Sequence, residues 1–304
     1  MSTSILIPLP HLTTLELTGE DAQAFLQAQV PSDVRQLNAE TAQISGWCTA
    51  KGRLLTTFVV WRVENGYRLI LASDVAEAIA KRLKMYILRL KVQVVRLEDP
   101  VVGLFNPPAT LGAFALPSDT WQVCQAEGVT AIRLDNTRAL LTGTASALAA
   151  VTAGTLQGPT DAWLRADIAQ GFPLVTQATS EHYVPQMVNL DKLGGVSFKK
   201  GCYPGQEIVA RTHYLGKIKR HLYRLKSAQP LAAGSEVRSA VLNGQACGSL
   251  LSAAPADTEN DWLALAVLQQ DAITGSIYLE TDQGRIDLTL IDEVMPAPEA
   301  EQPA

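Results

Sequence analysis

The residues whose types and spacing could support covalent or redox chemistry lie between Phe198 and Arg211, in the string FKKGCYPGQEIVAR. Cys202 follows Lys199 and Lys200, and cationic neighbours favour the thiolate form of a cysteine. Glycine and proline around the thiol favour a tight turn, because glycine permits positive φ and proline lacks an N–H donor. Exposed amide groups in such a turn would also stabilise the thiolate. The pattern predicts a reactive cysteine in a loop; the alternative is a small buried cysteine beside solvated lysines.

The string resembles the KGC(Y/F)xGQE signature of the YgfZ-type folate-binding proteins, which are relatives of the T protein of the glycine cleavage system. Every specified position is present, from Lys200 to Glu207. The resemblance implies an α+β fold with a T-protein-like folate-binding core, an inserted ferredoxin-like α+β layer and a C-terminal all-β barrel. It also implies tetrahydrofolate or another reduced folate as cofactor, and support of iron–sulfur cluster enzymes, including those of tRNA modification. Cys202 and Lys200 are the expected catalytic residues.

A second segment, WLRADIAQGFP, is similar to the part of the family in which a tryptophan lines the folate pocket, here Trp163. An aromatic face suits a flat pteridine ring, although the residues alone allow a core or capping tryptophan equally well. Leu12 aligns with an early aromatic of the family and could pack on the ring without stacking. Ala169 aligns with an acidic residue of T-protein relatives. Asp167, two residues away on a helix, is expected to point elsewhere.

The other expected cofactor-binding residues belong to the signature segment: Tyr203, Gln206, Glu207 and Arg211. Gln206 and Glu207 would orient the turn or the ligand. From Lys192 to Arg224 the chain has eight Lys and Arg residues and a single acid, Glu207. This excess predicts a local anion site, with the glutamate tail of a folate preferred over a phosphate backbone. A solvated connector is the alternative.

The composition is that of an ordinary globular protein, with 304 residues, 47% hydrophobic residues, 18% charged residues and a net charge of −5. This length predicts two or three structural units. The four cysteines are far apart, at positions 48, 124, 202 and 247, so no disulfide framework and no metal site are expected. Neither a signal peptide nor a membrane span is indicated. We therefore expect a cytoplasmic protein without a membrane partner.

Local patterns predict the elements that must position these residues. A strand is expected over Thr13–Leu17, followed by a helix from Ala22. A hairpin is expected over Leu54–Val63 and Tyr67–Ala72, because Asn-Gly joins these β-rich runs. Ser73 is a good N-cap for the helix that follows, and KVQVVRL, residues 91–97, resembles a strand.

Later patterns complete the N-terminal part. Further strands are expected over 121–125, 129–134 and 138–142, and a helix over 145–153. The economical interpretation is an open-faced antiparallel sheet with helices on one side. A helix capped by Thr160 or Asp161 should end at Gly171. The expected domains are a core over 1–221, with a layer inserted at about 45–155, a barrel over 222–295 and a disordered tail over 296–304.

Common self-contained enzyme motifs are absent from the sequence: it has no P-loop, dinucleotide fingerprint, HExxH or nucleophile elbow. The first hypothesis is a folate-binding accessory protein that uses Cys202 as a redox or carrier thiol. The alternative is a folate-dependent one-carbon (aminomethyl) transferase, which needs a carboxylate near the pterin; nothing in the sequence places the best early candidate, Asp33, there. Direct nucleic-acid binding is disfavoured by the overall acidity. The iron–sulfur client, one-carbon chemistry, transient cluster ligation by Cys202 and oligomeric state remain open.

Overall fold

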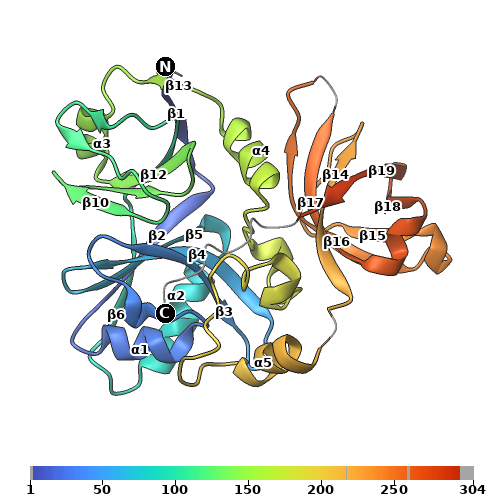
Figure 1. Cartoon of the computed structure of the whole chain (residues 1–304), viewed down its shortest axis with the longest axis horizontal. Coiled ribbons are helices and arrows are strands. Elements are labelled where there is room, and N and C mark those ends of the chain that lie inside the picture. The colour runs from blue at the N-terminus through green and yellow to red at the C-terminus, as the bar shows by residue number, and fades with distance from the viewer. Residues whose placement is uncertain (1–2, 217, 259–260, 295–304) are drawn as a thin grey trace.

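The fold is described from a computed structural model that covers residues 3–216, 218–258 and 261–294 (Figure 1). The tail expected over 296–304 lies outside the described residues. The fold is of mixed α+β type, with two sheets in the N-terminal part and a closed barrel near the C-terminus. The fold class expected from the sequence is confirmed.

The first sheet, sheet I, is fully antiparallel and has the strand order β3-β4-β5-β2-β6. Its strands are β2 (Leu12–Thr18), β3 (Ala42–Cys48), β4 (Leu54–Val63), β5 (Gly66–Ala72) and β6 (Gln93–Leu97). Helices α1 (Ala22–Gln29) and α2 (Ser73–Ile87) cover one face. The predicted β4–β5 hairpin is confirmed. At Gly66 a Cβ atom would collide with the backbone of Leu17, so the turn needs glycine there.

The second sheet, sheet II, has the order β10-β11-β12-β7-β1-β13, and in it β1 pairs in parallel with β13. Its strands are β1 (Ile5–Pro8), β7 (Val101–Phe105), β10 (Val123–Ala126), β11 (Val129–Arg133), β12 (Arg138–Gly143) and β13 (Leu156–Gln157). Helix α3 (Ala145–Val151) packs on its outer face through Leu148 and Val151. After β7 the chain forms a two-stranded ribbon, in which β8 (Thr110–Leu111) pairs with β9 (Phe114–Ala115).

The two sheets pack against each other, so the expectation of open-faced sheets is wrong. Along β4, Phe58 and Val60 face the α1/α2 layer, whereas Val59 and Trp61 face sheet II. Ile7 of β1 and Ile132 of β11 meet these residues from the other side. Because side chains alternate along a strand, each sheet buries both faces, and the layers run helix, sheet, sheet, helix.

Helix α4 (Thr160–Gln170) connects this sandwich to the barrel (Figure 1). It ends at Gly171, as predicted, and this glycine has a φ of 66°. The expected N-caps are wrong, because Ser73 and Thr160 are the first residues of their helices. Their hydroxyls instead donate to the carbonyl oxygens of Pro10 and Pro8, both at 2.9 Å. Helices α2 and α4 are thus tied to the β1–β2 connection.

The barrel is closed, with the order β14-β17-β16-β15-β18-β19 and β19 pairing with β14. Its strands are β14 (Arg220–Ser227), β15 (Glu236–Ser239), β16 (Ala246–Pro255), β17 (Trp262–Gln269), β18 (Ile277–Thr281) and β19 (Gly284–Glu293). Alternating residues such as Leu225, Leu250 and Leu279 fill it. The predicted barrel is confirmed.

Short helices lie between the larger units: η1 (Val34–Gln36), η2 (Gln177–Thr179), η3 (Pro185–Val188), α5 (Gln206–Leu215), η4 (Ala240–Leu242) and η5 (Gln270–Thr274). Strands β1 and β2 complete sheets that are otherwise built from residues 42–157. The division into domains at 45–155 and at 222 stays a prediction.

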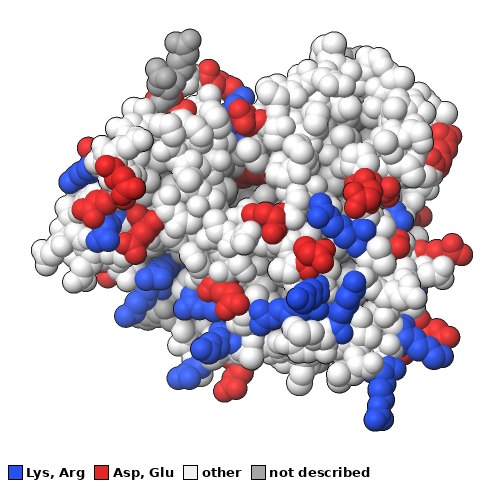
Figure 2. All heavy atoms as spheres, turned by 180° about the vertical axis from the view of Figure 1, so that it is seen from behind, with Lys and Arg blue, Asp and Glu red and all other residues white. Residues whose placement is uncertain are grey.

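The charged side chains are unevenly spread over the surface. Figure 2 shows Lys and Arg gathered in a band across the lower half of one face, although the chain is acidic overall. Across the described ranges, no helix is both long and apolar enough to cross a membrane.

Candidate functional site

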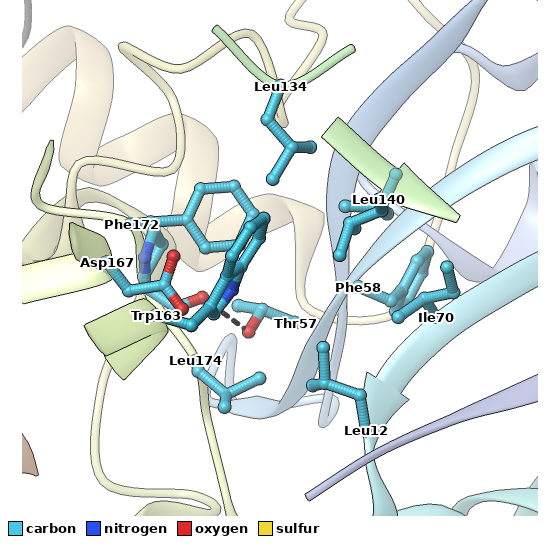
Figure 3. A pocket seen from close by; sticks show the side chains of 12 residues that line it. Leu12, Thr57, Phe58, Ile70, Leu134, Leu140, Trp163, Asp167, Phe172 and Leu174 are labelled. Carbon is cyan, nitrogen blue, oxygen red and sulfur yellow. Dashed lines mark hydrogen bonds between the residues drawn. The ribbon is translucent and has the colours of Figure 1, made fainter. Parts of the chain in front are cut away.

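A cavity lies between sheet I and sheet II, beside helix α4 (Figure 3). Strands β2, β4 and β5, helix α4 and the segment after it line the cavity. The lining residues are Leu12, Thr57, Phe58, Val59, Ile70, Leu134, Leu140, Trp163, Asp167, Phe172, Pro173 and Leu174. The fold therefore brings Leu12 and Trp163, which are 151 residues apart, to one apolar site. Both residues were expected to contact the same ligand.

Trp163 is held firmly in this site. Its side chain is 1% exposed, and its ring lies 5.3 Å from the ring of Phe105 at an interplanar angle of 46°. The guanidinium of Arg138 lies 5.2 Å from the Trp163 ring centroid. Gly103 of β7 leaves room for the indole, because a Cβ atom there would overlap the ring. The indole is thus oriented before any ligand binds.

A buried charge network adjoins the indole. Arg138, 2% exposed at the side chain, donates to Asp167 Oδ1 at 2.5 Å and to Asp135 Oδ2 at 2.7 Å. Burial raises the pKa of Asp167 to about 6, and the opposing attraction of Arg138 does not cancel this effect. The bond to Arg138 uses Oδ1, so the lone pairs of Oδ2 can accept from a further donor.

Asp167 was not among the expected site residues, because it was expected to point elsewhere. The structure corrects this expectation, since Asp167 lines the same cavity as Trp163. The two residues are four positions apart, and such residues share one face of a helix. This spacing was the available signal. Because the acidic residue of T-protein relatives aligns with Ala169, no acidic residue was expected at this site.

The cavity is small as it stands. Its volume is about 20 Å³, which holds about one water molecule. A bicyclic ring is much larger, so its binding needs outward movement of lining side chains. Phe172 and Leu174, which follow the helix-ending Gly171, line the cavity and are partly exposed, whereas Trp163 is buried (Figure 3). They are the natural side chains to move.

The signature segment forms a different part of the molecule, next to the turn between β3 and β4. Cys202 is exposed in a loop, as predicted, and Tyr203 beside it is buried. Burial raises the pKa of the Tyr203 hydroxyl strongly. Gly205 has φ of 83°, and a Cβ atom there would lie 2.7 Å from the Cα atom of Gly52. Glycine at 205 thus allows both the turn and its close contact with residues 49–52.

Lys200 joins this segment to helix α1. Its ammonium donates to the carbonyl oxygens of Gln27 (2.5 Å), Val30 (2.5 Å) and Ser32 (3.1 Å). These groups lie at the C-terminal end of α1, where unpaired carbonyls attract a cation. Burial lowers the pKa of Lys200 to about 8. All three ammonium protons are occupied here, so a role of Lys200 on the thiol of Cys202 stays a prediction.

The remaining residues that were expected to bind the cofactor belong to helix α5, and the local sequence pattern did not indicate this helix. Gln206 and Glu207 form its first turn, and Arg211 lies exposed one turn later. Gln186 Nε2 donates to the carbonyl oxygen of Val209 at 2.7 Å and anchors the helix. Glycine and proline disfavour a helix, and they occupy positions up to Gly205, directly before the first residue of α5. A loop was therefore expected here.

The predicted residues thus fall in two places that strand β4 connects. Gly52 contacts the signature loop, whereas Thr57 lines the cavity. Five residues of extended chain span at most about 17 Å. The two places are neighbours, and they are built from different elements. Among the described residues, no group of three His, Cys, Asp or Glu side chains is arranged to hold a metal ion.

Comparison with solved structures places the fold. No protein-family profile matches the chain. The glycine cleavage system aminomethyltransferase T from Bartonella henselae is similar over 95% of this chain and 85% of that chain, with a TM-score of 0.69 and 17% identity. The heterotetrameric sarcosine oxidase from Corynebacterium sp. U-96 matches 47% of this chain and 76% of that chain, with a TM-score of 0.32 and 16% identity. The chain therefore has a T-protein-like fold.

The Lys200 contacts predict a structural effect. Replacing Lys200 by Met leaves three carbonyl oxygens at the end of α1 without their donor, and we expect the free energy of unfolding to fall by about 1–3 kcal/mol. Denaturant unfolding measures this change. Lys199→Met is the matched control, because Lys199 is exposed. Equal effects of the two substitutions would contradict the structural role.

Proposed function

We propose that the protein binds tetrahydrofolate or another reduced folate in the cavity at Trp163 and supports iron–sulfur enzymes, including those of tRNA modification. The observation that carries this proposal is the convergence of Trp163, Leu12 and Asp167 on one cavity within a T-protein-like fold. The signature from Lys200 to Glu207, which resembles that of the YgfZ-type proteins, supports the accessory role.

The lining suits a pterin ring chemically. The indole of Trp163 offers a flat apolar face, and Leu12 packs on the opposite side of the ring. Asp167, once ionised, accepts hydrogen bonds from the ring N–H groups. A buried carboxylate selects strongly for such donors, because an unpaired charge in an apolar site is costly. In this proposal Asp167 takes over from the acidic residue that Ala169 replaces.

The exposed thiol of Cys202 supplies the reactive group of the proposed accessory role. It lies at the surface, where a partner protein can reach it, and the exposed Lys199 precedes it. Tyr203, Gln206, Glu207 and Arg211, which are proposed as ligand contacts, follow it in the same segment, the last three on α5. Since Tyr203 is buried and Gln206 half-buried, these two would act by holding the loop and the start of α5 in place.

The alternative, a one-carbon transferase, draws on the similarity to an aminomethyltransferase. Such chemistry needs a carboxylate at the reacting atoms of the folate. Asp33 is engaged elsewhere, because Arg35 Nε and Nη2 donate to its two oxygens at 3.1 Å. These bonds hold the pKa of Asp33 below its usual range. Asp167 is the carboxylate that lines the cavity, so the accessory role is preferred because of the signature from Lys200 to Glu207.

Folate binding should depend on the indole. Calorimetric titration with tetrahydrofolate under anaerobic conditions is expected to show saturable binding that Trp163→Leu weakens about tenfold or more, since aromatic stacking contributes about 1–3 kcal/mol. Trp262→Leu in the barrel is the matched control. Binding of equal strength in all three proteins would place the ligand elsewhere.

Folate affinity should also depend on pH through Asp167. Its pKa is about 6 in the folded protein, so the carboxyl is protonated at pH 5 and ionised at pH 7.5. Ionisation makes Oδ2, the oxygen that Arg138 does not use, a charged acceptor for the ring N–H groups, so affinity should rise over this range. Asp167→Asn should remove the rise. A rise of the same size in the variant would assign it to titration of the folate itself.

Cys202 should be needed for activity and not for folding. Cys202→Ser is expected to leave thermal stability and folate affinity unchanged, because the side chain is exposed. In cells that carry only this variant, a tRNA modification made by an iron–sulfur enzyme should fall. Loss of the fold would instead give Cys202 a packing role. Rapid folate-dependent methylene transfer by the purified protein would favour the transferase.

A further inference from the structure

A second cavity, with a volume of about 410 Å³, lies where α5 and η3 meet the first strand of the barrel. Three cationic residues line it: Arg53, Lys219 and Arg220. Apolar side chains, including Val184 and Met187, form another part of its wall. The described residues that line this cavity include no Asp or Glu.

The three cationic residues come from two parts of the chain, with Arg53 directly before β4, Lys219 directly before β14 and Arg220 at the start of β14. Arg53 donates from Nη1 to the carbonyl oxygen of His182 at 2.6 Å. The carbonyl oxygen of Lys219 accepts from Gln270 N at 3.0 Å. Arg220 opens β14 and pairs with Gln269 of β17 in the barrel. The sandwich and the barrel therefore both contribute positive charge to the same cavity.

These cations differ from many others in the protein. Arg138, Arg165 and Arg224, for example, each have a carboxylate partner. Within residues 3–216, 218–258 and 261–294, no carboxylate oxygen lies within 4.0 Å of a charged nitrogen of the three cavity cations. A concave region with three uncompensated cations attracts anions strongly.

The cavities on either side of this one each contain an acidic residue. A cavity of about 260 Å³ shares Arg220 with this one, and Glu236 lines it. Another of about 440 Å³ shares Thr212, and Asp191 lines it. Positive charge is thus concentrated in the middle cavity, with an acidic residue on either side. This arrangement suits a small molecule and would repel a polymer of phosphates.

We propose that the middle cavity binds a small molecule that carries two or more carboxylate or phosphate groups on a partly apolar body. Arginine forms bidentate bonds with both kinds of anion, and Val184 and Met187 supply apolar contact. The volume lies within the range of known ligand sites. This proposal stands independently of folate binding.

The anionic groups have two possible sources. Arg53 lies four residues before Thr57 of the folate cavity, a distance of at most about 14 Å of extended chain. The glutamate tail of a folate bound at Trp163 is one source. A separate anionic metabolite is the other. Both present the same chemistry to Arg53 and Arg220.

Calorimetric titration of the full chain with inorganic pyrophosphate and with γ-linked triglutamate tests the proposal. At least one of them should saturate the wild-type protein. The double substitution Arg53→Gln, Arg220→Gln should weaken this binding about tenfold or more, since each removed pair is a charge-assisted one. Lys81→Gln, Lys84→Gln is the matched control on the exposed surface of α2 and should bind as the wild type does. Thermal unfolding of each variant verifies that it folds.

The proposal is overturned if neither anion saturates the wild type, or if the control pair weakens binding as much as the Arg53 and Arg220 pair. Competition separates the two sources. Displacement of triglutamate by tetrahydrofolate identifies the folate tail, whereas simultaneous binding identifies a separate molecule. Triglutamate or pyrophosphate binding without any tetrahydrofolate binding would reject the folate proposal and keep this one. Trp163→Leu should leave anion binding unchanged.

Discussion

The face-to-face packing of sheet I on sheet II is the interaction on which the rest of the structure depends. Val59, Trp61 and Ile70 of one sheet meet Ile7 and Ile132 of the other. Burial of each such side chain stabilises the folded state by about 1.5–3 kcal/mol. Because the chain passes from β1 to β2 through Pro8 and Pro10, one short connection fixes the position of both sheets. The hydroxyls of Ser73 and Thr160 bind the same connection, so helices α2 and α4 begin where the sheets meet.

The cavity at Trp163, which is proposed to bind folate, is a consequence of this packing. Helix α4 lies against the sheet interface, and its face with Trp163 and Asp167 completes the layer between the sheets. Arg138 satisfies Asp167 from sheet II, which makes a buried carboxylate tolerable there. The same ion pair keeps a polar group beside an apolar wall. This combination is typical of small-molecule sites, in which few polar groups orient a ligand within an apolar surface.

The signature segment shows that one motif can combine structural and chemical roles. Lys200 holds the end of α1, Gly205 contacts the β3–β4 turn, and Gln206 begins α5. Cys202 and the outer face of α5 are left exposed to partners. The short segment from Gly52 to Thr57, which includes the start of β4, then joins this surface to the cavity.

Much of the local structure follows from the sequence alone, because it depends on neighbouring residues. Asn65 and Gly66 specify the hairpin, Gly171 ends α4, and alternation predicts the barrel strands, while the similarity of Lys200–Glu207 and Trp163 to a known family predicts the fold class. The meeting of Leu12 with Trp163, the face that covers each sheet, and the carbonyl partners of Lys200 arise only from long-range packing. Arg138 meets Asp167, and Arg53 and Arg220 line one cavity, because chain segments distant in sequence are brought together. No local pattern encodes those distances, so the tertiary structure alone decided them.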